Sequence, residues 1–346
     1  MPDKRSTKPL IVPLFIPFQG CPHRCVFCQQ EKITSQSASS FDPSEMNRVL
    51  DRAVKSPAFD PERRPQVAFY GGTFTNLPIQ DMTALLKLVE PYIRKGYFRS
   101  IRISTRPDAI DARRMDLLKH FNVTTVELGA QSMDNRVLDL SRRGHRARDT
   151  VGAVARLKQN GFRVGIQLMP GLPGDSEATF FTGVEKVIHL RPDMVRLYPT
   201  IVIKGTVLAK MVEEHRYSPM GLDEAVKICA ESCERFESHG IPVIRMGLMS
   251  SPHLLQDGQI VAGPWHGAFG DLVRSMIFHK KIEPLLPRQG ETTRFLIRVA
   301  PHEIPLVRGH KNSGILSIEQ KTGAKVTKVL PDKDVTPGTV RVEKIE

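Results

Sequence analysis

The sequence predicts an α/β fold: a partial (βα)6, TIM-like barrel followed by a small α+β module. Three observations support this fold class. Six short apolar runs recur between residues 10 and 199, and Gly or Pro bounds most of these six runs. Longer amphipathic runs lie between the apolar ones. Strand–helix units in series favour a parallel sheet with helices outside and right-handed connections. Six such units are too few for a closed eight-stranded barrel.

The apolar runs are rich in Val, Ile, Leu and aromatic residues, as buried strands usually are. We predict strands at 10–18 (LIVPLFIPF), 66–70 (QVAFY), 100–104 (SIRIS), 124–129 (TTVELG), 163–169 (RVGIQLM) and 193–199 (DMVRLYP). A further strand, 241–246 (IPVIRM), follows them.

Apolar residues at helical spacing predict the helices between these strands. Asp42 is a good N-cap for the first of them, and Gly161 and Gly240 are C-terminal stop signals. The predicted helices cover 43–56, 79–93, 146–161, 176–190 and 222–240. On parallel sheets the chemistry collects at the carboxyl ends of the strands, so functional residues are expected in the loops that follow them.

The chain divides into three parts. Residues 1–245 form the predicted barrel core. Residues 246–290 read as an irregular, loop-rich extension that holds the only Trp. Residues 291–346 form the small α+β module.

Composition is that of a globular protein, with 40% hydrophobic and 25% charged residues. No apolar segment approaches the roughly 18 residues that a membrane-spanning helix needs, so no membrane partner is expected. The N-terminus lacks a secretory signal pattern, which predicts a cytoplasmic location. In that reducing compartment, clustered cysteines indicate metal or redox chemistry. The net charge of +13 favours a polyanionic partner such as RNA, although solubility alone is an alternative reason for it.

Three of the five cysteines, Cys21, Cys25 and Cys28, directly follow the first predicted strand in the order C-x3-C-x2-C. Three thiolates suit a 4Fe–4S cluster that leaves one iron open to a substrate or cosubstrate. A zinc site with His23 is the alternative, but structural zinc sites commonly combine two separated ligand pairs. Two further cysteines, 229 and 233, share one face of a predicted helix, where they could hold a second metal or pack in the core.

The stretch CPHRCVFC, with an aromatic residue before its third cysteine, resembles the signature of the radical S-adenosylmethionine (SAM) superfamily. Five further motifs follow in order at strand ends: FYGGTFTNL, ISTRPDAID, VELGAQSMDNRVLDLSRRGH, GIQLMPGLPGD and RLYPTIVIKGT. Together they resemble the radical SAM core of the Elongator catalytic subunit, which modifies the wobble uridine of tRNA. The resemblance extends from about Phe18 to Thr206.

The resemblance implies two cofactors, SAM and a 4Fe–4S cluster held by the three clustered cysteines. It implies an enzyme in which reductive cleavage of SAM gives a 5′-deoxyadenosyl radical that abstracts hydrogen from an RNA substrate, in particular tRNA. The electrons would come from a donor such as flavodoxin or ferredoxin. Two alternatives stay open: a radical SAM enzyme acting on a small molecule, as coproporphyrinogen oxidases do, and a non-enzymatic iron–sulfur protein that binds RNA.

The same resemblance gives candidate SAM contacts at strand ends and in the loops after them. They are Gly71, Gly72, Thr73, Glu127, Gln131, Arg163, Gln167 and Gly171. Glu127 could equally be a buried structural carboxylate with a charged partner. Tyr198, Lys204 and His266 are candidates for the substrate side, although a Tyr at a strand end often serves packing.

Two departures from the Elongator subunit limit the comparison. Ser104 stands where that subunit usually has a Glu, so no SAM contact is carried onto it. The chain is also too short to hold the acetyltransferase domain that follows there, and no acetyltransferase activity is expected.

The stretch VRGHKNSGILSIEQKTGAKV resembles a minimal KH module, in which a G-x-x-G loop between two helices clamps a nucleic-acid backbone. Gly309, His310 and Lys311 are therefore candidate RNA-binding residues, with Asn312 in place of the second glycine. The alternative is a small cap that only packs against the barrel.

Overall fold

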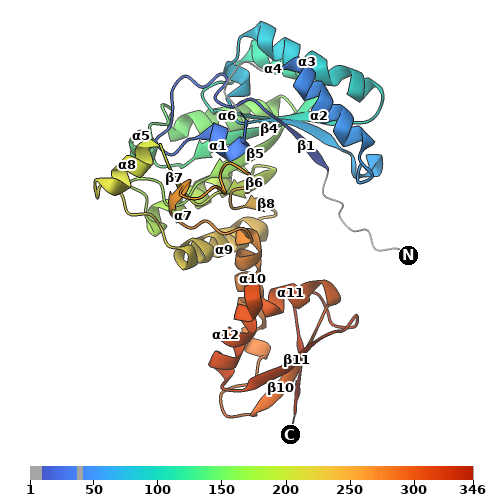
Figure 1. Cartoon of the computed structure of the whole chain (residues 1–346), viewed down its shortest axis with the longest axis vertical. Coiled ribbons are helices and arrows are strands. Elements are labelled where there is room, and N and C mark those ends of the chain that lie inside the picture. The colour runs from blue at the N-terminus through green and yellow to red at the C-terminus, as the bar shows by residue number, and fades with distance from the viewer. Residues whose placement is uncertain (1–9, 37–41, 346) are drawn as a thin grey trace.

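The computed structural model describes residues 10–36 and 42–345, and its main body is a seven-stranded parallel sheet curved into a half-barrel (Figure 1). The strands follow one another in chain order, and every neighbouring pair is parallel. They are β1 (Ile11–Phe15), β2 (Gln66–Tyr70), β3 (Ser100–Thr105), β4 (Val123–Gln131), β5 (Arg163–Leu168), β6 (Met194–Leu197) and β8 (Val243–Met246).

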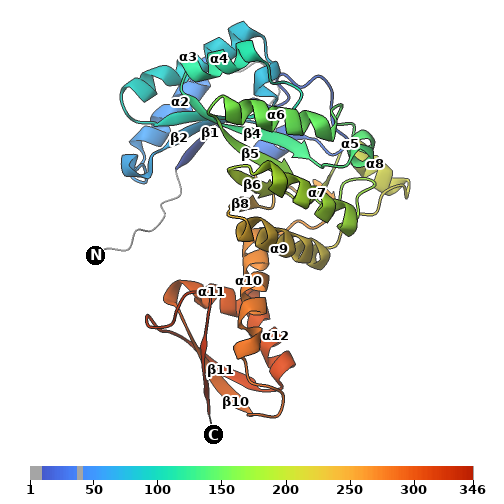
Figure 2. The ribbon, with the colours of Figure 1, turned by 180° about the vertical axis from the view of Figure 1, so that it is seen from behind.

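Helices cover the outer face of the sheet, as Figures 1 and 2 show from opposite sides. Their apolar faces and the outward-facing strand residues form one large core. The covering helices are α2 (Pro43–Lys55), α3 (Ile79–Arg94), α4 (Ala112–His120), α6 (Ala147–Gln159), α7 (Glu177–Leu190) and α9 (Leu222–Ser238). Shorter helices lie in the loops: α1 (Gln30–Thr34), α5 (Asn135–Leu140) and α8 (Val207–Glu213). Throughout the described residues, every helix is too short or too polar to cross a membrane.

The predicted fold class is confirmed, and the sheet is one strand larger than the six predicted units. The strand predicted at 241–246 is β8, which pairs with β6 and extends the same sheet. The first strand ends at Phe15, earlier than predicted, because the chain turns at Phe18, whose φ is 58°. The helix α4 was not predicted; its nine residues carry too few apolar positions to show a clear period.

The structure differs from the expectation for residues 246–290, where it places a 14-residue helix, α10 (Phe269–Ile282). This helix packs on α9 and continues into the C-terminal module, where its Phe278 and Ile282 join the module's core. The short strands β7 (Val202–Ile203) and β9 (Ile260–Ala262) form a separate antiparallel pair.

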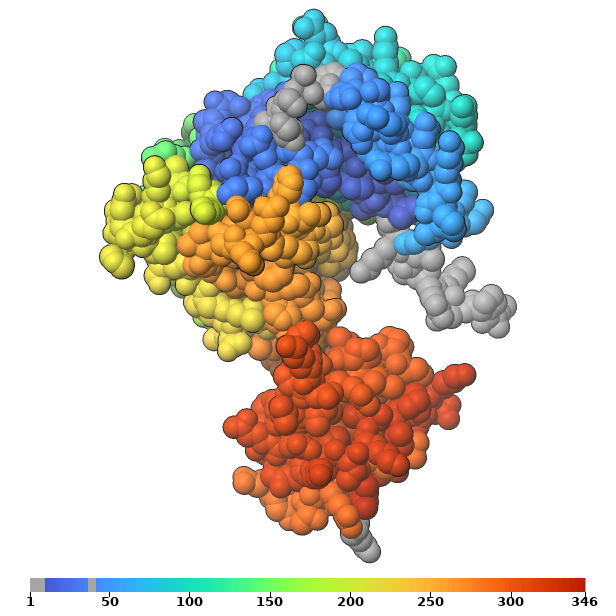
Figure 3. Space-filling view, viewed as in Figure 1, coloured from blue at the N-terminus to red at the C-terminus, as the bar shows by residue number. Residues whose placement is uncertain are grey.

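The C-terminal module has the order strand, helix, helix, strand, strand. Its elements are β10 (Arg294–Val299), α11 (Ile304–Arg308), α12 (Ser313–Thr322), β11 (Lys325–Pro331) and β12 (Arg341–Lys344). The central strand β10 is parallel to β11 and antiparallel to β12. Figure 3 shows the module as a separate body, joined to the barrel by a narrow connection where α10 runs.

Candidate active site

The cysteine loop follows β1 at the carboxyl edge of the sheet, beside the glycine loop that follows β2. The backbone of Thr73 donates a hydrogen bond to the carbonyl oxygen of Gln19 (2.7 Å), which ties the two loops together. A Cβ atom at Gly72 would lie 2.1 Å from that same oxygen. The glycine is therefore needed for the contact between the two loops, whatever it does toward a ligand.

The three clustered cysteines line a single cavity of about 600 Å³ inside the half-barrel. The Cys21 Sγ atom lies 3.3 Å from the hydroxyl of Thr73, and the Cys25 Sγ atom accepts a hydrogen bond from Nη1 of Arg143 (2.9 Å). Burial, together with repulsion from the two neighbouring thiols, raises the pKa of Cys28 to about 12. Three thiolates in this position therefore need cations beside them.

Arg143 is a site residue that the sequence reasoning missed. Its Nη2 atom donates to the carbonyl oxygen of Gly129 (2.6 Å), and its buried Nε has no partner among the described residues. It belongs to the loop after α5, which packs directly on the cysteine loop: Nε2 of His23 lies 3.0 Å from the Arg143 carbonyl oxygen. The only sequence signal was the basic stretch SRRGH within a motif already noted for its resemblance.

The residues present fit a 4Fe–4S cluster with SAM. In the described part of the chain, no three His, Cys, Asp or Glu side chains converge on one metal ion. A cubane does not require such convergence, because each thiolate binds a different iron. The unpartnered Nε of Arg143 beside Cys25 suits an anionic group of the cosubstrate, such as its carboxylate.

His145 follows Arg143 by two residues, is buried, and does not line the cavity. Burial, and to a smaller extent the charges of Arg143 and Arg106, lowers the pKa of His145 from its ordinary 6.5 to about 4. Its imidazole is therefore neutral at neutral pH.

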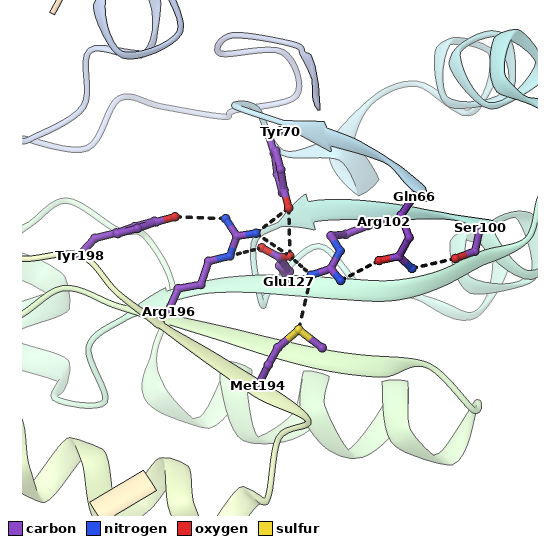
Figure 4. A network of polar contacts seen from close by, with 8 residues as sticks. All are labelled: Gln66, Tyr70, Ser100, Arg102, Glu127, Met194, Arg196 and Tyr198. Carbon is purple, nitrogen blue, oxygen red and sulfur yellow. Dashed lines mark hydrogen bonds and ion pairs between the residues drawn. The ribbon is translucent and has the colours of Figure 1, made fainter. Parts of the chain in front are cut away.

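Deeper in the barrel, a polar network surrounds Glu127 (Figure 4). The Oε1 atom of Glu127 accepts hydrogen bonds from Arg102 Nη1 (2.5 Å), and from Arg196 Nη2 (3.0 Å). Tyr70 donates to the same oxygen (3.2 Å), and the second carboxylate oxygen lies 2.8 Å from Arg196 Nε. Glu127 is thus a buried, paired carboxylate that also lines the cavity.

Several of the predicted candidates come together around this cavity. Nε2 of Gln167 donates to Oε1 of Gln131 (3.0 Å), so the ends of β4 and β5 present a joined amide pair. Tyr198 accepts a hydrogen bond from Arg196 Nη1 (3.1 Å). The candidates that line the cavity are Gly71, Gly72, Thr73, Glu127, Gln131, Arg163, Gln167 and Tyr198.

Arg163 nevertheless lies at the wrong end of the barrel for a SAM contact beside the cysteines. It begins β5, and in a parallel sheet the amino end of every strand is opposite the carboxyl edge that carries the cysteine loop. Its side chain is 58% exposed and lies 3.8 Å from Asp193. We therefore do not retain Arg163 in the SAM site.

Three other candidates lie outside the cavity lining. Gly171 forms a turn whose carbonyl oxygen accepts a hydrogen bond from Tyr217 (2.5 Å). Lys204 is exposed. The ring of His266 makes an edge-to-face contact with His310 of the C-terminal module, with ring centroids 4.7 Å apart.

The remaining cysteines, 229 and 233, are fully buried in the apolar core on α9. Burial raises the pKa of both thiols. Their position supports packing in the core, and they take no part in the cavity described above.

Comparison with known proteins connects this site to a family. A model described as the Radical SAM superfamily matches residues 15–182, and one described as the Radical_SAM C-terminal domain matches residues 192–278. A tRNA uridine(34) acetyltransferase of Methanocaldococcus infernus is 28% identical over 246 residues, 60% of this chain and 46% of that protein. Human Elongator complex protein 3 is 25% identical over 254 residues, 61% of this chain and 46% of the relative.

The chain thus spans about half the length of these curated relatives. A solved structure of the M. infernus Elp3 protein, lacking an N-terminal segment, superposes with a TM-score of 0.61 at 23% identity. The superposition covers 78% of this chain and 63% of that one, which shows a shared fold. The cysteine motif, the half-barrel and the two matched family models together establish that this chain belongs to the radical SAM superfamily, whose enzymes use a 4Fe–4S cluster and SAM.

Proposed function

We propose that this radical SAM enzyme acts on RNA, and in particular on tRNA. The observation that carries the proposal is the match, over about 60% of this chain, to proteins named tRNA uridine(34) acetyltransferases. This chain covers about half of those relatives' length, and the family models that match it are radical SAM models, so the proposal concerns the radical step and not acetyl transfer.

Residues at different positions in the cavity would bind the cluster and the cosubstrate. Cys21, Cys25 and Cys28 would hold the cluster, and Arg143 would bind the cosubstrate's carboxylate. The Gln131–Gln167 pair offers amide donors and acceptors nearby. When bound, the cluster and SAM supply a one-electron route to hydrogen-atom abstraction from the substrate. The three cysteines line a cavity inside the half-barrel, so this chemistry would take place there and not on the outer surface.

The C-terminal module supports an RNA substrate. Its loop between α11 and α12 exposes His310 and Lys311, and the backbone of Gly309 is left-handed (φ 65°). A Cβ atom at Gly309 would lie 2.7 Å from the backbone nitrogen of Gly314, so the turn is tight. The contact between His310 and His266 sets this loop against the part of the chain that precedes α10. An exposed cationic loop between two helices can engage a phosphate backbone.

The test uses the anaerobically reconstituted holoprotein with SAM and a reductant. Total tRNA from a strain deleted for the gene is supplied either intact or digested to nucleosides, and 5′-deoxyadenosine is measured. We expect intact tRNA to stimulate its formation and the digest to have no effect. Mass spectrometry of tRNA nucleosides from the wild-type strain should then show a modified nucleoside that the deletion strain lacks.

A matched pair of variants tests the role of the module. Lys311→Glu in the loop should weaken tRNA binding and reduce its dependence on salt, while Lys333→Glu makes the same charge change outside the loop and serves as the control. Equal stimulation by intact and digested tRNA, with identical nucleosides in the two strains, would show that RNA is not the substrate.

A further inference from the structure

The cavity lining carries many more positively charged side chains than negatively charged ones. The residues of its lining that the structure describes include seven arginines, Arg24, Arg102, Arg106, Arg143, Arg163, Arg196 and Arg245, but only two acids, Glu127 and Asp193. Asp193 lies next to Arg163 at the amino end of the barrel. Glu127 alone therefore faces the two guanidinium groups in the middle of the barrel.

This central network carries one unbalanced positive charge. Arg102 and Arg196 share the single carboxylate of Glu127. Their remaining partners within the described residues are neutral, namely Gln66, Met194 and the hydroxyls of Tyr70 and Tyr198. Burial is the main cause that raises the pKa of Tyr70, so this phenol stays protonated and supplies no negative charge.

The network also has more donors than acceptors. Both oxygens of Glu127 are engaged, and the buried Nε of Arg102 has no partner in the described part of the chain. The oxygen of Tyr198 accepts from Arg196, so its own O–H points away from the guanidinium and is free to donate. Leaving a buried cation without a counter-charge is costly, and buried charges are normally paired.

We propose that the middle of the barrel binds an oxyanion, a carboxylate or phosphate group of the molecule on which the enzyme acts, beside Arg196 and Tyr198. This group supplies the second negative charge that the network lacks. The inference rests on the proposed function only in assuming that the cavity is the substrate site.

A substitution at Ser104 can test whether the network binds an anion. Ser104 lies opposite Glu127 in the register of β3 and β4, two residues after Arg102, so all three side chains are on the inner face of the sheet. It is half-buried and lines the cavity. A glutamate at this position would place an internal carboxylate where we expect the ligand's charge.

The experiment measures thermal unfolding of the reconstituted holoprotein in sodium acetate or sodium phosphate, against sodium chloride of equal ionic strength. We expect a saturable rise of the wild-type midpoint with one of the two anions. Ser104→Glu should have a higher midpoint in chloride and no saturable response. Tyr198→Phe should fold and bind the anion about tenfold more weakly, because a hydrogen bond to a charged group is lost. Arg163→Gln, at the amino end of the barrel, should respond as wild type does.

Two sources of the oxyanion can be told apart. If the group is a phosphate of the RNA, phosphate acts and a tRNA anticodon stem-loop competes with it. If it is the carboxylate of a small-molecule substrate, acetate acts and the stem-loop does not compete with it. Loss of the response in saturating SAM would assign the charge to SAM itself and overturn the proposal.

Equal midpoints in all three salts, or equal responses of wild type and Ser104→Glu, would also overturn it. Formation of 5′-deoxyadenosine that depends on tRNA is a separate readout. The proposed function can therefore fail while the anion still binds, and the anion site can be absent while tRNA is still the substrate.

Discussion

Replacing Glu127 by Gln removes the one carboxylate that the described residues place between two buried guanidinium groups, while keeping the shape of the side chain. Arg102 is 3% and Glu127 6% exposed at their side chains, and Arg196 is 13% exposed. The amide oxygen can still accept hydrogen bonds, but it carries no charge. Two positive charges then face each other in the barrel without an anion between them.

The expected cost follows from that burial. Removing one partner of a buried ion pair destabilises proteins by about 3–5 kcal/mol, because the remaining charge is left without compensation. That is a large part of the roughly 5–15 kcal/mol by which folded proteins are stable. The matched control is Glu185→Gln, whose partner Arg235 lies 2.9 Å away with both side chains more than a third exposed. An exposed pair contributes only about 0–1 kcal/mol.

The assay is equilibrium unfolding in urea, followed by circular dichroism, for wild type and the two variants in chloride buffer. We expect Glu127→Gln to lose several times more free energy of unfolding than Glu185→Gln. Acetate or phosphate should restore part of the loss in Glu127→Gln and none in the control. If the two variants lose the same amount, the central network carries no buried charge of the kind described, and the reasoning is wrong.

Three further predictions follow from the site. Cys25→Ala should fold but retain less iron after anaerobic reconstitution, with no SAM-dependent change in its EPR spectrum; full iron uptake would contradict the ligand assignment. Gly72→Ala should lower the thermal midpoint far more than Gly221→Ala, because a Cβ atom meets the Gln19 oxygen at the first position and nothing within 4 Å at the second. His145 has a pKa of about 4 in the folded chain against 6.5 ordinarily, so the unfolded chain binds the proton first as the pH falls. Stability should therefore be full above about pH 6.5 and decline toward pH 4, by about 2 kcal/mol between pH 7.5 and 5. His145→Phe should remove this decline, and a decline of unchanged size would refute the assignment.

The apolar runs predicted the six strands because strands of a sheet covered by helices are rich in Val, Ile and Leu, and that pattern is local. The helix α10 escaped prediction because it packs on α9 at one end and on the module at the other. Its apolar residues therefore point in more than one direction and show little periodicity.

The cysteine loop was predictable, since its three cysteines lie within eight residues of one another. Arg143 was not, because its approach to Cys25 depends on a loop more than a hundred residues further along the chain. Arg163 was wrongly included for a different reason: the predicted strand at 163–169 already makes it the first residue, at the amino end, and the resemblance to the family was followed instead of that position.

Local patterns of residues were enough to predict a parallel α/β fold, three thiolates on the first loop and an excess of positive charge. Where that charge lies depends on the folded chain, since Arg102, Glu127 and Arg196 come from β3, β4 and β6. The register of the sheet brings these three side chains together inside the barrel. Pairing between charges depends on distances of a few ångströms, and for residues far apart in sequence those distances exist only in the folded chain.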